Sequence, residues 1–84
     1  MTATTDVGLA DLRDRMAHLD MQIIELVRER IALSDEVRSI RLDAGDTRAD
    51  LSAERTTFRT YRTKLGLHAT GLARSLLVLC GGTL

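Results

Sequence analysis

Arg30 interrupts a regular row of apolar residues, which makes it the first candidate for chemistry in this chain. The row repeats at spacings of three and four residues, the pattern of one face of a long helix. Its members are Leu12, Met16, Leu19, Ile23, Leu26, Leu33, Val37 and Ile40. Arg30 stands where the next apolar residue is expected. Because burying an unpaired guanidinium costs several kcal/mol, this position needs an anionic partner.

Arg41 extends the same anomaly. It follows Arg30 by three helical turns and about 20°, so both side chains project from nearly one face, about 16 Å apart. Two cations there favour an anionic ligand. The alternative is a pair of internal salt bridges, or arginine stems along the edge of the core with their heads in water. The spacing leaves both interpretations open.

Glu54 is a comparable anomaly in the second half of the chain. It falls within a second apolar row, with Arg55 at the edge of that row. The row consists of Leu51, Phe58, Tyr61 and Leu65. A carboxylate in this position needs a donor, which is either an arginine of the first helix or a ligand hydroxyl.

Other reactive residue types lack the spacing that a known site requires. Cys80 is the single cysteine, which excludes an internal disulfide and predicts a small buried side chain. His18 and His68 have no second histidine at metal-ligand spacing. Arg59 and Arg62 are interpreted as a solvated helix face. No phosphate loop, nucleophile elbow or zinc motif occurs, so we expect no metal and no cofactor.

An all-α fold with three helices per chain must position these residues. The chain has no proline and only one Phe and one Tyr, which favours leucine-rich helices over a sheet. The first helix is predicted over residues 9–42, about 50 Å long, whereas a compact chain of this length is about 30 Å across. Such a helix must overhang, so we expect a single domain over residues 1–84, with residues 1–8 flexible, that works as an intertwined homodimer.

The remaining helices follow from turn and capping residues. Asp50 or Thr47 is expected to cap a second helix that reaches about Lys64 and ends at Gly66. A third helix is predicted over residues 69–80, with Gly81 and Gly82 after it. Its apolar face is predicted to consist of Leu72, Leu76 and Leu79.

Charge and hydropathy restrict the partners. Residues 1–47 contain six basic and ten acidic residues, and residues 48–84 contain six basic and two acidic residues. The two halves therefore attract each other, and the sequence lacks the excess of basic residues that is typical of nucleic-acid-binding proteins. The N-terminus lacks a signal-peptide pattern, and the most apolar segment, residues 76–80, is too short to cross a bilayer. We therefore expect a cytoplasmic protein that contacts neither nucleic acid nor membrane.

The arrangement of these residues resembles the all-helical chorismate mutases, over residues 9–66. The resemblance is carried by Leu12-Arg13-Asp14-Arg15, Leu19-Asp20, Ile23-Ile24-Glu25-Leu26-Val27, Arg30 and Arg41. It is closest to the short actinobacterial subgroup, because Gly45-Asp46-Thr47-Arg48 and Ser52-Ala53-Glu54 are similar to that subgroup's loop and second-helix start. In that family two three-helix chains interlock.

The resemblance implies a role for each matched residue. Arg30 and Arg41 would hold a carboxylate and the ether-side oxygens of chorismate, and Asp50 and Glu54 would contact its hydroxyl. Thr47 would line the site. Arg13 would reach in from the other subunit to bind the second carboxylate. Since Arg13 and Arg30 are about 25 Å apart along one helix, only an antiparallel neighbour brings them together.

The implied reaction is the rearrangement of chorismate to prephenate, a concerted pericyclic step that uses no acid, base, nucleophile or cofactor. Arg41, Arg30 and Glu54 would be the catalytic residues, with Arg41 stabilising charge on the breaking ether oxygen. The family's arginine before the helix-two glutamate is replaced here by Ala53, for which Arg55 is the candidate substitute. The last helix also lacks a polar residue for the ether oxygen, so we expect weak unassisted activity.

An activating partner and two alternative functions stay open. The resemblance implies activation by a shikimate-pathway synthase, although the basic C-terminal tail associated with that docking is absent. An isochorismate pyruvate-lyase or a 4-amino-4-deoxychorismate mutase would keep the site and change the substrate. A non-catalytic helical dimer that binds a partner protein would instead neutralise Arg30 and Arg41 with acids such as Glu54.

Overall fold

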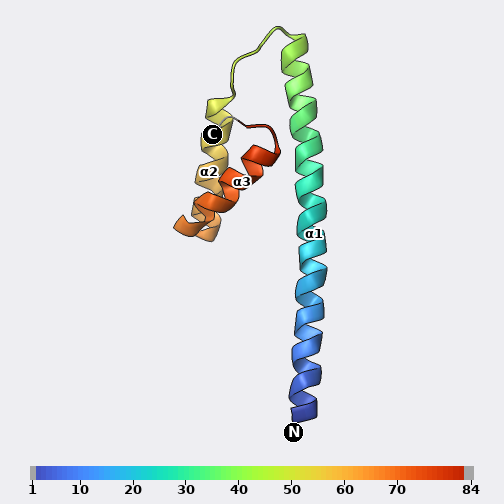
Figure 1. The fold of residues 1–84 in the computed structure, drawn as a ribbon. Helices are drawn as coiled ribbons and strands as arrows, with labels where there is room; N and C mark the ends of the chain where they lie inside the picture. The colour runs from blue at the N-terminus through green and yellow to red at the C-terminus, as the bar shows by residue number, and fades with distance from the viewer. Residues whose placement is uncertain (1, 83–84) are drawn as a thin grey trace.

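The computed structural model describes residues 2–82, which form three α-helices and one short 3₁₀ helix and contain no strand. The elements are α1 (Thr2–Asp43), α2 (Leu51–Leu65), η1 (Leu67–Ala69) and α3 (Thr70–Leu79). The predicted all-α class and the long first helix are confirmed. The N-terminal half of α1 projects far beyond α2 and α3 (Figure 1), and the molecule measures 66 × 25 × 15 Å.

The first helix begins earlier than predicted and ends where predicted. Residues 2–8, expected to be a flexible segment before the helix, belong to α1, and Met1 lies outside the described residues. Gly8 does not stop the helix, because one glycine costs only about 1 kcal/mol relative to alanine. At the other end Gly45, with φ of 80°, donates to the Leu42 carbonyl at 2.9 Å, a glycine-terminated helix end.

A small core lies between α2 and the η1–α3 segment. Its buried apolar residues are Ala69, Ala73, Leu76, Leu77 and Cys80, which confirms the prediction for Cys80. The predicted apolar face of the third helix is only partly right, since Leu72 and Leu79 are 55% and 59% exposed. Ala69, Ala73 and Cys80 join Leu76 and Leu77 in the buried face, with spacings of three and four, because small side chains allow helices to approach closely.

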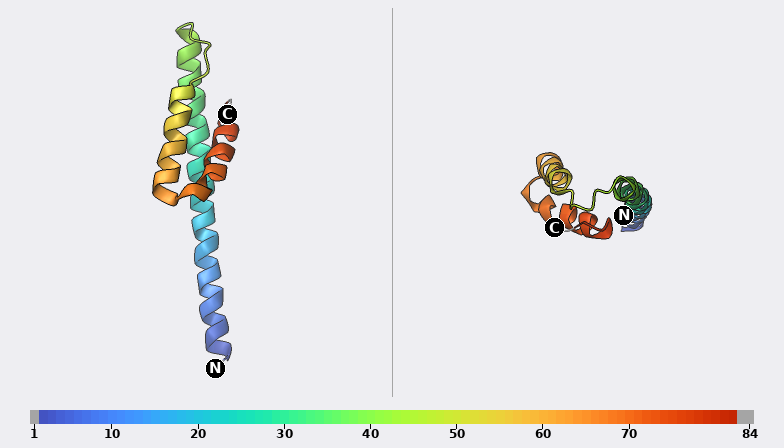
Figure 2. Two further views of the ribbon diagram at one scale, coloured as in Figure 1. Left: turned by 90° about the vertical axis from the view of Figure 1, so that its left-hand side faces the viewer. Right: turned by 90° about the horizontal axis from the view of Figure 1, so that it is seen from above.

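The apolar row of α1 is not covered by its own chain. We call this row the apolar stripe: Leu12, Met16, Leu19, Ile23, Leu26, Leu33, Val37 and Ile40, which are 52–69% exposed. Viewed along α1, that helix lies on one side, and α2 and α3 lie together on the other (Figure 2). The radius of gyration is 18.1 Å, against about 12 Å for a compact chain of this length. The core therefore forms without most of α1.

Asp50 caps α2, as predicted, and its removal should weaken the fold. Its carboxylate accepts a hydrogen bond from the Ala53 amide at 3.3 Å. We expect Asp50→Ala to lower the free energy of unfolding by about 1 kcal/mol, measured by urea denaturation at fixed chain concentration. Asp50→Asn should lower it less, because asparagine also caps a helix. Equal losses in the two variants would contradict the capping role.

Candidate functional site

A cleft of about 590 Å³ opens between the C-terminal half of α1, the loop that follows it, the start of α2 and the end of α3. The loop returns the chain beside α1, so residues from all three helices meet there (Figure 1). Four arginines line the cleft: Arg30, Arg38, Arg41 and Arg48. Three acids also line it: Asp46, Asp50 and Glu54. The cleft is therefore lined by charges of both signs.

Arg30 joins the three helices through uncharged partners. Its guanidinium donates to Cys80 Sγ at 3.1 Å and to Thr57 Oγ1 at 3.4 Å. The side chain is half-buried, and within residues 7–82 no carboxylate forms an ion pair with it. A half-buried cation with neutral partners keeps most of its attraction for an anion. The expected anionic partner of Arg30 is thus not supplied by this part of the chain.

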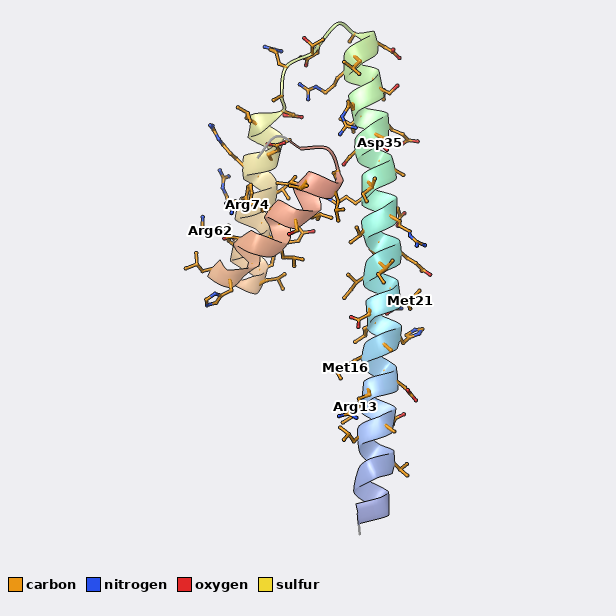
Figure 3. The ribbon with its side chains drawn as sticks, in the orientation of Figure 1. Arg13, Met16, Met21, Asp35, Arg62 and Arg74 are labelled. Atoms are coloured by element: carbon orange, nitrogen blue, oxygen red, sulfur yellow. The ribbon has the colours of Figure 1, made fainter. Side chains whose placement is uncertain are left out.

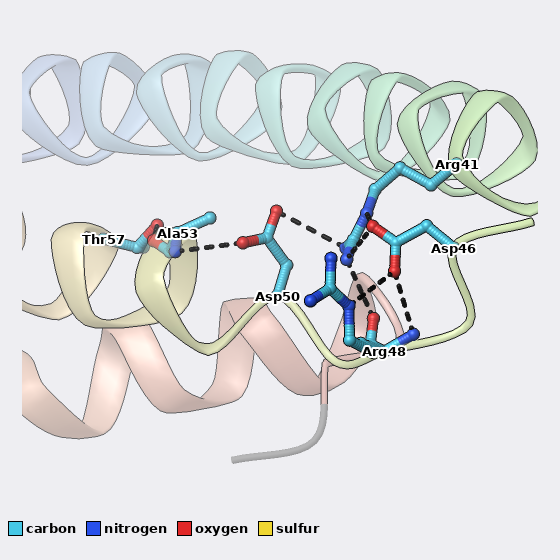
Figure 4. Close-up of polar contacts among 6 residues, drawn as sticks. All are labelled: Arg41, Asp46, Arg48, Asp50, Ala53 and Thr57. Atoms are coloured by element: carbon cyan, nitrogen blue, oxygen red, sulfur yellow. Dashed lines mark hydrogen bonds and ion pairs between the residues drawn. The ribbon is translucent and has the colours of Figure 1, made fainter. Parts of the chain in front are cut away.

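Arg41 has the opposite environment, because loop carboxylates surround it (Figure 4). Its Nε and Nη2 donate to Asp46 Oδ2 at 3.1 and 3.0 Å, and Nη2 also donates to the Arg48 carbonyl at 2.9 Å. Nη1 lies 3.5 Å from Asp50 Oδ2. The internal salt-bridge alternative therefore describes Arg41 in this structure, and an incoming anion would have to displace Asp46.

Asp46 is held in its ionised form by the same contacts. The Arg48 backbone amide and the Arg41 and Arg48 guanidiniums donate to this carboxylate and lower its pKa from 3.8 to about 2. A depressed pKa means that ionisation favours the folded state. The stabilisation is present above about pH 4 and is lost as the pH falls through about 2.

We expect the Asp46 carboxyl group to remain ionised at pH 3. Carbon-detected NMR of the side-chain carboxyl would follow its titration directly. Arg41→Gln removes one of the donors and should move the midpoint upward towards 3.8. A wild-type midpoint near 3.8 would contradict the hydrogen-bonded arrangement of the loop.

Glu54 and the end of α3 close one end of the cleft. Glu54 is buried and makes polar contact within the structure. Arg38 donates to the Cys80 carbonyl, which ties α3 to α1. A Cβ on Gly82 would lie 2.8 Å from both Glu54 Oε1 and the Leu77 carbonyl oxygen, and because the backbone oxygen cannot move as the side chain can, glycine is required there. The two C-terminal glycines therefore let the backbone pass directly over the site.

The cleft brings together most of the residues predicted for the site and leaves two outside. Arg30, Arg41, Thr47, Asp50 and Glu54 all line it. Arg13 lies on the projecting half of α1, far from α2 and α3 (Figure 3). Arg55 does not enter the cleft and lines a separate surface groove, because one residue after Glu54 the helix has turned by about 100°.

Sequence reasoning missed Arg38, Asp46 and Arg48 as lining residues. Arg38 follows Arg30 by eight residues and lies about 80° around the helix from it, a signal too weak to separate it from a solvated arginine. The two loop residues have no helical periodicity, so only the folded path of the loop places them against Arg41.

Comparison with protein-family models, curated proteins and solved structures finds no match to this chain. Among the described residues, no helix is both long and apolar enough to cross a membrane.

Proposed function

We propose that the chain is a chorismate mutase that acts as an intertwined homodimer with a site shared between two subunits. The observation that carries the proposal is Arg30, a half-buried cation paired only with neutral groups in a cleft of about 590 Å³. The four arginines of the cleft exceed its three carboxylates by one charge, which suits a small anion such as a dicarboxylate. The family resemblance names chorismate as that dicarboxylate.

In this proposal Arg30 binds a substrate carboxylate, and Asp50 and Glu54 lie where they can accept a hydrogen bond from the substrate hydroxyl. Thr47 lines the loop side of the cleft. The rearrangement breaks the ether C–O bond and forms a C–C bond within one molecule, so the protein's task is to hold the reactive chair. Arg41 would stabilise the negative charge that develops on the ether oxygen.

The second carboxylate of the substrate needs a donor that one chain does not place in the cleft. In the proposed antiparallel dimer the other subunit contributes its Arg13. The exposed apolar stripe supports this assembly, because eight large side chains at 52–69% exposure form one face of α1, interrupted only at Arg30, on which a second helix can pack. Pairing of the stripes would also cover the projecting half of α1.

The direct test is turnover of chorismate to prephenate by the purified chain. We expect measurable but slow turnover, because Ala53 brings no cation to the wall of the cleft. Addition of a shikimate-pathway synthase would show whether a partner raises the rate. A complete absence of prephenate at high enzyme concentration, with and without that partner, would overturn the proposal.

Asp46→Asn separates a substrate role for Arg41 from a purely structural one. The substitution removes the negative charge that occupies Nε and Nη2 of Arg41. If Arg41 binds substrate, the variant should have a KM several-fold lower than the wild type. If Arg41 only organises the loop, the variant should lose stability and gain no affinity. Isothermal titration with prephenate and urea denaturation distinguish these outcomes.

Ala53 favours a second candidate with the same site and another substrate. It lines the cleft on α2, and its methyl group leaves space and no charge where the family has an arginine. An isochorismate pyruvate-lyase or a 4-amino-4-deoxychorismate mutase would use this altered wall. Comparison of the three substrates at equal concentration identifies the one with the highest kcat/KM.

The saturated contacts of Arg41 favour a third candidate, a non-catalytic helical dimer that binds a partner protein. In that case Arg41 only holds the loop against α1. None of the three substrates would then be converted.

A further inference from the structure

α2 carries a row of arginines on the side that faces away from α1. We call Arg55, Arg59 and Arg62 the arginine face; at 100° per residue they point within about 60° of one another. They border a shallow groove with Phe58 at its base, and Arg74 of α3 stacks on that ring at 6.0 Å. Figure 3 shows Arg62 and Arg74 on the side of α2 and α3 opposite α1.

No carboxylate in the part of the chain that the structure describes forms an ion pair with the arginine face. The only acids between residues 48 and 84 are Asp50 and Glu54, and both belong to the cleft. The arginine face is therefore a cationic surface, and any carboxylate that pairs with it comes from outside this part of the chain.

α1 carries a complementary row. Six of the nine acids of α1 gather within about 60° of one helix face, and no arginine of residues 7–43 falls in that sector. We call this row the acidic stripe: Asp11, Asp14, Glu25, Glu29, Glu36 and Asp43. The acidic stripe lies about 120° around α1 from the apolar stripe, so different neighbours can cover the two. Glu25 and Glu29 form no ion pair among the described residues.

The two charged surfaces cannot meet within one chain, because the arginine face looks away from α1. We propose that the arginine face of one chain binds the acidic stripe of α1 in a second copy of the protein. Glu25 and Glu29 are four residues apart, as are Arg55 and Arg59, so α1 of one copy and α2 of the other, side by side and parallel, can pair Glu25 with Arg55 and Glu29 with Arg59 at a common spacing of about 6 Å. The chain as a whole has no net charge, which favours a second copy of the protein as the partner of the arginine face over a polyanion such as nucleic acid.

This contact is separate from the apolar stripe and from the cleft. It would join the proposed dimers into larger assemblies. It does not depend on whether the protein is catalytic. Because the pairs are exposed, each is weak and strongly screened by salt. The association should therefore be reversible and confined to low ionic strength.

Sedimentation velocity of the full chain at two salt concentrations tests the proposal. At about 0.01 M salt the Debye length is about 30 Å, and at about 1 M it is about 3 Å. We expect a concentration-dependent increase in mass above the dimer at low salt and only the dimer at high salt. The same mass in both conditions, over a wide range of chain concentration, would overturn the proposal.

Matched charge variants separate a specific contact from a general effect of net charge. Glu29→Arg and Asp20→Arg change the net charge equally, but Asp20 lies on the opposite side of α1. Arg59→Glu and Lys64→Glu form the corresponding pair on α2, where Lys64 lies about 140° from Arg59. We expect Glu29→Arg and Arg59→Glu to weaken low-salt association about tenfold. Their controls, Asp20→Arg and Lys64→Glu, should have little effect.

The combined variant Glu29→Arg with Arg59→Glu should recover the association, because the charges are exchanged and the net charge is that of the wild type. Equal effects within each matched pair, or no recovery in the combined variant, would overturn the contact. In all these variants the mass at high salt and the turnover of chorismate should stay at wild-type values. Loss of either would indicate damage to the proposed dimer and not to this second contact.

Discussion

Arg30→Leu should abolish turnover and leave the fold intact. The guanidinium contacts only Cys80 Sγ and Thr57 Oγ1, so its removal breaks no ion pair among residues 7–82. Leucine also restores the apolar pattern between Leu26 and Leu33. Removal of one donor that stabilises transition-state charge costs about 10²–10³ in kcat, and loss of substrate binding adds to this in kcat/KM. We therefore expect kcat/KM to fall by at least about a thousandfold with an unchanged or higher Tm.

Two variants make the Arg30 result specific. Arg28→Leu removes an arginine of the same helix that does not line the cleft, and it should leave kcat/KM close to the wild-type value. Arg30→Lys keeps the charge and loses the two-pronged donor geometry, so it should recover only part of the activity. Wild-type turnover in Arg30→Leu would remove Arg30 from the site. A large fall in Tm would instead make Arg30 a structural residue.

Ile23→Asp should convert the proposed dimer into an unstable, inactive single chain. Ile23 lies in the middle of the apolar stripe and is 55% exposed in one chain. A carboxylate there would be buried without a partner when two stripes pair, at a cost of several kcal/mol. Turnover should be lost as well, because the second subunit would no longer supply Arg13. Light scattering gives the mass, and the prephenate assay gives the activity.

Met21→Asp is the matched control. Met21 is 54% exposed, almost the same as Ile23, but it is two residues away and points to nearly the opposite side of α1. It should leave both mass and turnover unchanged. If the two variants lose the dimer equally, the contact does not follow the apolar stripe. If Ile23→Asp remains an active dimer, the stripe is not the dimer interface.

The sequence was sufficient to predict the helices, because helix formation depends on local signals. Periodic leucines and the absence of proline predicted α1, and Asp50 and Gly66 predicted the ends of α2. Arg30 could be picked out as a cleft residue for the same reason, since one cation in an apolar row is visible without any tertiary contact. The start of α1 was less predictable, because Thr4, Thr5 and Asp6 are all residue types that can cap a helix, yet the helix continues through them.

Tertiary structure decided how the charges are distributed among partners. Arg30 and Arg41 were equivalent in the sequence, yet the path of the loop surrounds Arg41 with Asp46 and Asp50 and leaves Arg30 with neutral groups. The approach of α3 to α2 likewise selected Ala73 and Cys80 for burial in place of Leu72 and Leu79. Local sequence patterns determine which residues share a helix face. Which charges pair depends on the close approach of segments that are distant in the sequence, and this approach cannot be predicted from residue spacing.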